Sequence, residues 1–123
     1  MNEQSVKMAM IAVNSLEDKK ANDIHIIDIS EISVIGDMFI IAGGTNRNQI
    51  QAMCDDLREK LGRAGYEAKQ IEGYNNANWV LLDYRDIIIH IFDPDTRSYY
   101  DIERIWRDGR RVELEEIKNG LSE

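Results

Sequence analysis

Residues 38–65 read MFIIAGGTNRNQIQAMCDDLREKLGRAG and carry the clearest structural signals in the chain. The apolar run from Met38 to Ala42 ends at two glycines, which predicts a buried strand. Asn46 with Gln49 three residues later resembles a capping box, and Gly65 suits the left-handed residue that often follows a helix. Between them, apolar residues recur at helical spacing: Ile50, Met53, Cys54, Leu57, Leu61 and Ala64. The stretch therefore predicts a strand, a turn and a helix.

Patterns on both sides of this stretch predict further elements. An apolar stripe at helical spacing predicts a first helix over residues 5–16, and the β-branched run Ile24–Ile29 predicts a strand. A weaker strand is expected over Tyr66–Ile71. Two stronger strand patterns, Trp79–Leu82 and Ile87–Phe92, are separated by four residues. Such a short connection predicts an antiparallel hairpin.

The C-terminal part adds a turn and a helix. Asp93-Pro94-Asp95-Thr96 predicts a turn with proline at its second position. Ser98 begins a second capping pattern, and Tyr99, Ile102 and Trp106 then form the stripe of a short helix that ends near Gly109. The order of elements predicts an α/β (α+β) fold with a mixed sheet of about five strands and flanking helices. We expect one domain over residues 1–112 and a polar tail over 113–123, either a frayed helix or disordered.

Composition limits the class of protein. With 43% hydrophobic and 31% charged residues, the 123-residue chain has the make-up of an ordinary globular domain. No apolar run approaches the roughly 20 residues of a membrane span, and the first residues do not resemble a signal peptide. One cysteine allows no internal disulfide. These features predict a cytoplasmic protein with no membrane association.

The net charge disfavours direct nucleic-acid binding. The chain has 23 acidic and 15 basic side chains and a formal charge of −8, which would repel a phosphate backbone. Its densest group of arginines also contains interspersed carboxylates, so a solvated, mixed-charge segment is expected there. These arginines are Arg104, Arg107, Arg110 and Arg111.

Several candidate chemical sites have simpler structural explanations. Asp93 and Asp95 near His90 could hold a metal, but the predicted turn accounts for both carboxylates. Cys54 lies on the apolar stripe of the long helix and is expected to be buried rather than nucleophilic. The sequence therefore predicts no metal and no cofactor.

The strand, glycine pair and helix at residues 38–65 also resemble a nucleotidyltransferase. That enzyme needs paired aspartates on a strand soon after the glycines, to clamp a metal ion. Asp55 and Asp56 are instead adjacent within the predicted helix, where neighbouring side chains point in different directions. The spacing therefore disfavours nucleotidyltransferase catalysis, and the sequence predicts no catalytic residue. A divergent nucleotidyltransferase is the alternative function.

Residues 72–103 are unusual in combining aromatic and acidic side chains. They contain seven acidic residues against two basic ones, and six of the nine aromatic residues of the chain. Aromatic anchors within an acidic field suit a basic protein partner, because anchors carry affinity and charge directs encounter. The alternative is that most of these rings belong to the core, which we expect for Phe92, Tyr99 and Trp106.

Scattered motifs between Ser5 and Val112 resemble one family, the ribosomal silencing factors, also called Iojap-like proteins. The matching residues occur in the order and near the spacing of that family, although Arg85 stands where a glycine is usual. The matches are Asp37 to Gly43, Arg47, Gln49, Glu72-Gly73, Trp79, Asp83, His90 to Phe92, Arg97, Tyr100 to Glu103 and Trp106.

The resemblance implies a specific biology. Members of that family have an α/β fold similar to nucleotidyltransferases but without catalytic carboxylates. They bind ribosomal protein fourteen of the large ribosomal subunit, impede joining of the small subunit and so lower translation when nutrients are scarce. Related proteins can also form homodimers. The resemblance therefore implies a bacterial, cytoplasmic translation repressor that is not an enzyme.

The predicted hairpin contains the candidate partner-binding residues. Alternation along a strand places Trp79, Leu81 and Asp83 on one face, and Val80, Leu82 and Tyr84 on the other. If Val80 and Leu82 pack beneath the helices, Trp79 and Leu81 form an apolar patch on the outer face. The alternative is that Trp79 belongs to the core. The predicted site comprises Trp79, Leu81, Asp83, Glu72, Asn78 and Tyr84.

Overall fold

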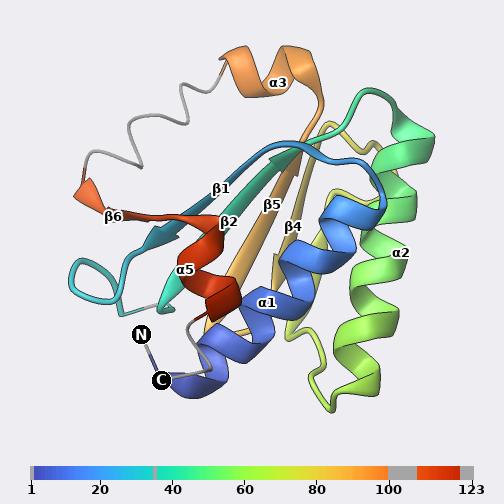
Figure 1. The fold of residues 1–123 in the computed structure, drawn as a ribbon. Helices are drawn as coiled ribbons and strands as arrows, with labels where there is room; N and C mark the ends of the chain where they lie inside the picture. Colours follow the sequence, from blue (N-terminus) through green and yellow to red (C-terminus); the bar gives the residue numbers. More distant parts are fainter. Residues whose placement is uncertain (1, 35, 100–107, 120–123) are drawn as a thin grey trace.

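The computed structural model describes residues 2–34, 36–99 and 108–119. Its helices and strands form one mixed sheet with helices packed beside it (Figure 1). In chain order they are α1 (Glu3–Asp18), β1 (Asn22–Asp28), β2 (Met38–Gly43), α2 (Arg47–Arg63), β3 (Gln70–Glu72), β4 (Trp79–Asp83), β5 (Ile87–Phe92), α3 (Pro94–Tyr99), β6 (Arg110–Val112) and α5 (Leu114–Asn119). No helix in the described ranges has the length and apolarity needed to cross a bilayer.

The sheet has six strands in the order β3-β4-β5-β2-β1-β6. The central strands β2 and β5 are parallel, and every other neighbouring pair is antiparallel. This confirms the predicted mixed sheet and the β4–β5 hairpin. The sequence did not predict β6, because a three-residue strand that begins with two arginines has no visible apolar alternation.

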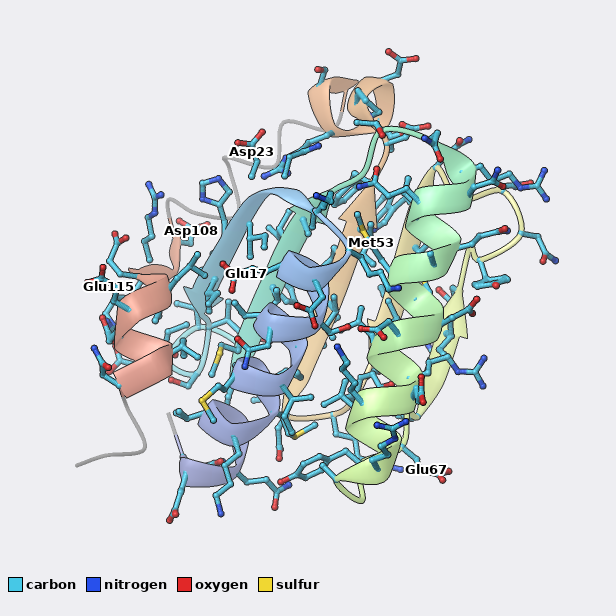
Figure 2. All side chains as sticks on the ribbon, turned by 45° about the vertical axis from the view of Figure 1, so that its right-hand side comes forward. Glu17, Asp23, Met53, Glu67, Asp108 and Glu115 are labelled. Atoms are coloured by element: carbon cyan, nitrogen blue, oxygen red, sulfur yellow. The ribbon has the colours of Figure 1, made fainter. Side chains whose placement is uncertain are left out.

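Helices α1, α2 and α5 cover one face of the sheet, whereas α3 lies beyond the ends of β2 and β5 (Figure 1). The main core lies between these helices and the sheet, and α2 contributes five buried side chains to it: Ile50, Met53, Cys54, Leu57 and Leu61. In Figure 2, Met53 lies on the sheet side of α2, while Glu67 and Glu115 lie at the periphery. A smaller apolar cluster, formed by Ile27, Ile29, Ile41, Phe92 and Phe39, packs on the opposite face.

The C-terminal helix α5 belongs to the same core. Ile117 is fully buried there, and Leu114 packs against the cluster. Part of the segment expected to be a polar tail is therefore helical and packed, although the division at residue 112 stays a prediction. Two basic residues of the mixed-charge segment form ion pairs: Arg110 with Asp28 and Glu116, and Arg111 with Glu113.

The start of α2 confirms one half of the predicted capping box and changes the other. Asn46 is the N-cap, and its side chain accepts a hydrogen bond of 2.8 Å from the Gln49 N–H. The side-chain oxygen Oε1 of Gln49 accepts a hydrogen bond of 2.7 Å from the Thr45 N–H, and not from the N–H of the cap residue. Its amide donates to the Lys19 and Lys20 carbonyls, so Gln49 joins the end of α1 to the start of α2.

The predicted turn at residues 93–96 is wrong. The chain enters α3 there, with Pro94 as the first helical residue, where its missing N–H costs nothing. The Asp93 carboxylate accepts a hydrogen bond of 2.8 Å from the Thr96 N–H, as an N-cap does. The helix thus begins several residues before Ser98. Residues 100–107 of the predicted helix, with Ile102 and Trp106, lie outside the described residues.

Arg85 occupies a strained turn at the tip of the β4–β5 hairpin. Its φ is +71°, and the Asp86 N–H donates to the Tyr84 carbonyl at 2.9 Å, which defines a γ-turn with positive φ. The Asp83 carboxylate stabilises the turn by accepting a hydrogen bond of 2.8 Å from the Arg85 N–H. Glycine, which has no Cβ, would adopt this backbone conformation with less strain than arginine does.

We expect Arg85→Gly to stabilise the protein slightly. A residue with a Cβ in the left-handed conformation lowers the stability of the folded state by about 1–2 kcal/mol. Glycine avoids this strain but costs about 0.5–1 kcal/mol, because its unfolded chain has more conformational freedom. The net gain in the free energy of unfolding should be about 0.5–1 kcal/mol, measured by urea denaturation. Arg85→Ala, which keeps a Cβ, is the control and should show no gain. A lower stability for Arg85→Gly would contradict the inference that the Arg85 backbone is strained.

Candidate functional site

The β4 strand presents two different faces, as its alternation predicts. Val80 and Leu82 are fully buried beneath the helices. Trp79 is 40% exposed on the opposite, outer face, where Leu81 and Asp83 are half-buried. Trp79 is thus the most exposed large apolar side chain of the described sheet, whereas the other two exposed ones, Ile32 and Val34, lie in the loop between β1 and β2. The alternative in which Trp79 belongs to the core does not hold.

Trp79 packs against two aromatic side chains of β5, Phe92 and His90. The strand register pairs Trp79 with Phe92 and Leu81 with His90. The Trp79 and Phe92 ring centroids are 5.1 Å apart, and the indole Nε1–H donates a hydrogen bond of 3.1 Å to His90 Nδ1. Phe92 and His90 are themselves buried. The exposed indole is therefore fixed by contacts on its inner side.

Carboxylates and a polar loop border this aromatic surface. Glu72 is exposed and lies opposite Leu81 in the β3–β4 pairing, while Asp83 is next along the same face and also caps the hairpin turn. Asn78 is exposed and its carbonyl accepts from the Asp93 N–H at 3.0 Å. Four predicted residues besides Trp79 are thus brought together around one surface: Leu81, Asp83, Glu72 and Asn78. We call this set, with Trp79, the Trp79 face.

Tyr84 does not belong to the Trp79 face. It is only 4% exposed and belongs to the core cluster on the helix side of the sheet, because alternation places it with Val80 and Leu82. Tyr84 lines a separate cleft of about 770 Å³ between α2 and the β3–β4 edge. Its inclusion in the predicted site is therefore corrected.

The acidic residues considered for catalysis have separate structural partners. Asp55 accepts hydrogen bonds from the Tyr74 hydroxyl at 2.9 and 3.2 Å. Asp56 turns toward α1 and accepts a hydrogen bond of 2.6 Å from the Ser15 hydroxyl of that helix, and Lys60 of α2 pairs with it at 3.0 Å. Burial alone raises the pKa of Asp56, but these hydrogen bonds outweigh it and the pKa is lowered. The two carboxylates diverge, as the spacing predicted.

The other candidate chemical groups are also explained by the fold. Asp93 caps α3, and within residues 2–34, 36–99 and 108–119 no three His, Cys, Asp or Glu side chains gather as metal ligands would. Cys54 is fully buried, and burial raises the pKa of its thiol to about 12, so it is protonated at neutral pH.

Sequence reasoning missed the role of His90. From the sequence, this residue was considered only beside a possible metal site, yet its Nδ1 accepts a hydrogen bond from Trp79, and its buried Nε2 has none among the described residues. The signal was available, because residues diagonal to each other across a hairpin, here Trp79 and His90, come within reach when their side chains are long.

The fold and the Trp79 face define a small acidic α+β protein with an exposed aromatic surface bordered by carboxylates. A family model described as "Ribosomal silencing factor during starvation" matches residues 2–122. The chain belongs to this family.

Individual relatives agree with the family match. The chain is 39% identical over 111 residues to a ribosomal silencing factor of Halalkalibacterium halodurans, which covers 90% of this chain and 95% of the relative. It is 36% identical over 115 residues to that of Bacillus subtilis, covering 94% and 96%. A crystal structure of a protein from Chromobacterium violaceum superposes with a TM-score of 0.80 at 34% identity, over 87% of this chain and 88% of that one.

Proposed function

We propose that this protein is a bacterial, cytoplasmic translation repressor that acts by binding the large ribosomal subunit. In this proposal the Trp79 face docks on ribosomal protein fourteen, a small basic protein at the subunit interface. The bound protein then prevents the small subunit from joining and lowers translation when nutrients are scarce. The family to which the chain belongs, and the names of its relatives, support the ribosome as the site of action.

The exposure of Trp79 is the observation that carries the proposed docking site. Tryptophan is enriched among the few interface residues that dominate binding energy, and such residues are usually ringed by contacts that exclude water. The surrounding Glu72 and Asp83 supply negative charge, and the whole chain carries −8. A basic partner that covers the indole therefore meets both an anchor and a complementary field.

Co-sedimentation with purified large subunits tests the proposed function directly. The protein should migrate with the large subunit in a sucrose gradient, and adding it before small subunits should reduce the peak of joined ribosomes. Migration only at the top of the gradient at modest salt would contradict the proposal.

We expect association to depend on ionic strength more than dissociation does. Charges at the rim of an interface mainly steer the encounter and are screened beyond about 10 Å at 0.1 M salt. Raising monovalent salt at constant magnesium should therefore lower the association rate several-fold and change the dissociation rate less. Surface plasmon resonance with large subunits as analyte measures both rates.

A matched pair of charge variants localises this effect. Glu72→Gln removes a carboxylate beside Leu81, whereas Glu115→Gln removes an exposed one on α5, on the helix-covered side. The first should slow association and flatten its salt dependence, and the second should resemble the native protein. Equal effects of the two variants would show that only the net charge matters.

The same surface offers a route to self-association. In the proposed homodimer the Trp79 faces of two copies would cover each other, so a dimer and a ribosome complex would exclude one another. Sedimentation velocity over a range of protein concentrations tests this, and a concentration-independent monomer would argue against it.

A further inference from the structure

The bond between Trp79 and His90 connects the exposed ring to the interior of the sheet. Trp79 and His90 are diagonal neighbours across the β4–β5 hairpin, and the indole Nε1–H lies 3.1 Å from His90 Nδ1. Phe92 supports the indole from below at 5.1 Å. The hydrogen bond to His90 and the ring contact with Phe92 thus both hold the indole in place.

His90 is itself held in place by its neighbours. The side chain is 7% exposed, and its ring meets the Phe39 ring edge-on with centroids 4.9 Å apart. The Phe92 ring lies nearly parallel to it at 6.1 Å. Because both neighbours are bulky aromatics, the imidazole cannot rotate without displacing them, and Nδ1 stays aimed at the indole.

The protonation state of His90 follows from its surroundings. Burial lowers its pKa to about 4, so the ring is neutral at physiological pH. Because Nδ1 accepts the indole N–H, the single ring proton is on Nε2. That N–H is buried and has no acceptor among the described residues. Burying a donor without a partner costs stability, which the contact with Trp79 only partly offsets.

A fold selected for stability alone would favour an apolar residue at this position. Residues that reduce stability without an evident structural gain occur typically at functional sites. Fixing a side chain before binding lowers the entropy that is lost when the complex forms, and so raises affinity. The folding stability that is lost at His90 would therefore be offset by a higher affinity of Trp79 for its partner.

We propose that His90 is the positioning residue of the Trp79 face, holding the indole through Nδ1 in the orientation that its partner recognises. The proposal rests on the proposed function, in which Trp79 contacts the large subunit. It adds a buried residue that touches no partner but determines how tightly the partner is bound.

Two variants separate the acceptor from the bulk of the side chain. His90→Phe keeps an aromatic ring without an acceptor. His90→Asn places its side-chain oxygen close to the position of Nδ1 and so keeps an acceptor for the indole. We expect His90→Phe to bind large subunits about tenfold more weakly than the native protein without a lower melting temperature, and His90→Asn to recover most of the affinity.

The indole N–H provides a readout that does not depend on the ribosome. The chain has two tryptophans, so a Trp106→Phe background leaves Trp79 as the only indole signal in a ¹H–¹⁵N spectrum. Its exchange with solvent should be slow in the native protein and in His90→Asn, and at least several-fold faster in His90→Phe. If His90→Phe does not fold, His90→Leu takes its place with the same expectations.

The outcomes distinguish this inference from the proposed function. Unchanged indole exchange in a folded His90→Phe protein would overturn the positioning role, as would faster exchange with native affinity. Failure of the native protein to bind large subunits would instead overturn the proposed function, because the exchange measurement is independent of the ribosome.

Discussion

Trp79→Glu is expected to fold normally and to lose at least about 30-fold in affinity for the large ribosomal subunit. Removal of a tryptophan anchor commonly costs on the order of 2 kcal/mol or more, and a carboxylate in its place must also be desolvated at the interface. Because the indole is 40% exposed, the new charge can remain in water in the free protein, so folding is spared.

Two neighbouring positions provide controls for this experiment. Val80 follows Trp79 in β4 but is fully buried on the other face, so Val80→Glu should unfold the domain. Ile32 is 52% exposed in the loop between β1 and β2, so Ile32→Glu removes a comparable apolar surface elsewhere. It should remain folded and bind normally. Circular dichroism measures folding, and co-sedimentation measures binding.

The three variants together give a decisive pattern. A folded Trp79→Glu protein that binds with native affinity would refute the Trp79 face as the docking site. An unfolded one would show that the indole supports the fold more than its exposure indicates. Equal loss of binding in Ile32→Glu would point to a wider surface that includes the loop.

The sequence predicted those elements in which the repeat of apolar residues is long enough to distinguish a helix from a strand. Helix α2 has an apolar stripe over several turns, and the β4–β5 hairpin has two strands with a short connection, so both were predicted correctly. The alternation in β4 left only two possible faces for Trp79, and the structure places it on the outer one.

The misses have physical causes at particular residues. The pair Asp93-Pro94 can begin either a turn or a helix, because an acidic residue followed by proline is common in both. In the structure the Asp93 carboxylate accepts a hydrogen bond from the Thr96 N–H and so caps a helix. Strand β6 forms only because β1 offers an edge to pair with, which a local sequence pattern does not reveal. The hydrogen bond between His90 and Trp79 was not predicted because the two residues are neighbours across the hairpin and not along the sequence.

Glycine at position 73 links the fold to the Trp79 face. Gly73 has a φ of +82°, and a Cβ built there would collide with the carbonyl oxygen of Trp79. Two other glycines provide matched comparisons. Gly65, just beyond α2, has a φ of +93° with open space around it, while Gly62 lies within α2 with nothing near its side-chain position. The three positions separate backbone conformation from steric collision.

We expect Gly73→Ala to destabilise the protein by about 3 kcal/mol, of which about 1–2 kcal/mol is the cost of a left-handed alanine and the rest is the collision. Gly65→Ala should cost only the conformational part, and Gly62→Ala should stabilise α2 by about 0.5–1 kcal/mol. Urea denaturation gives the three free energies of unfolding, provided that the slopes agree. Because relief of the collision must shift the backbone of Trp79, Gly73→Ala should also weaken large-subunit binding where Gly65→Ala does not. A Gly73→Ala protein as stable as Gly65→Ala, with native binding, would show that the loop before β4 adjusts without moving the indole.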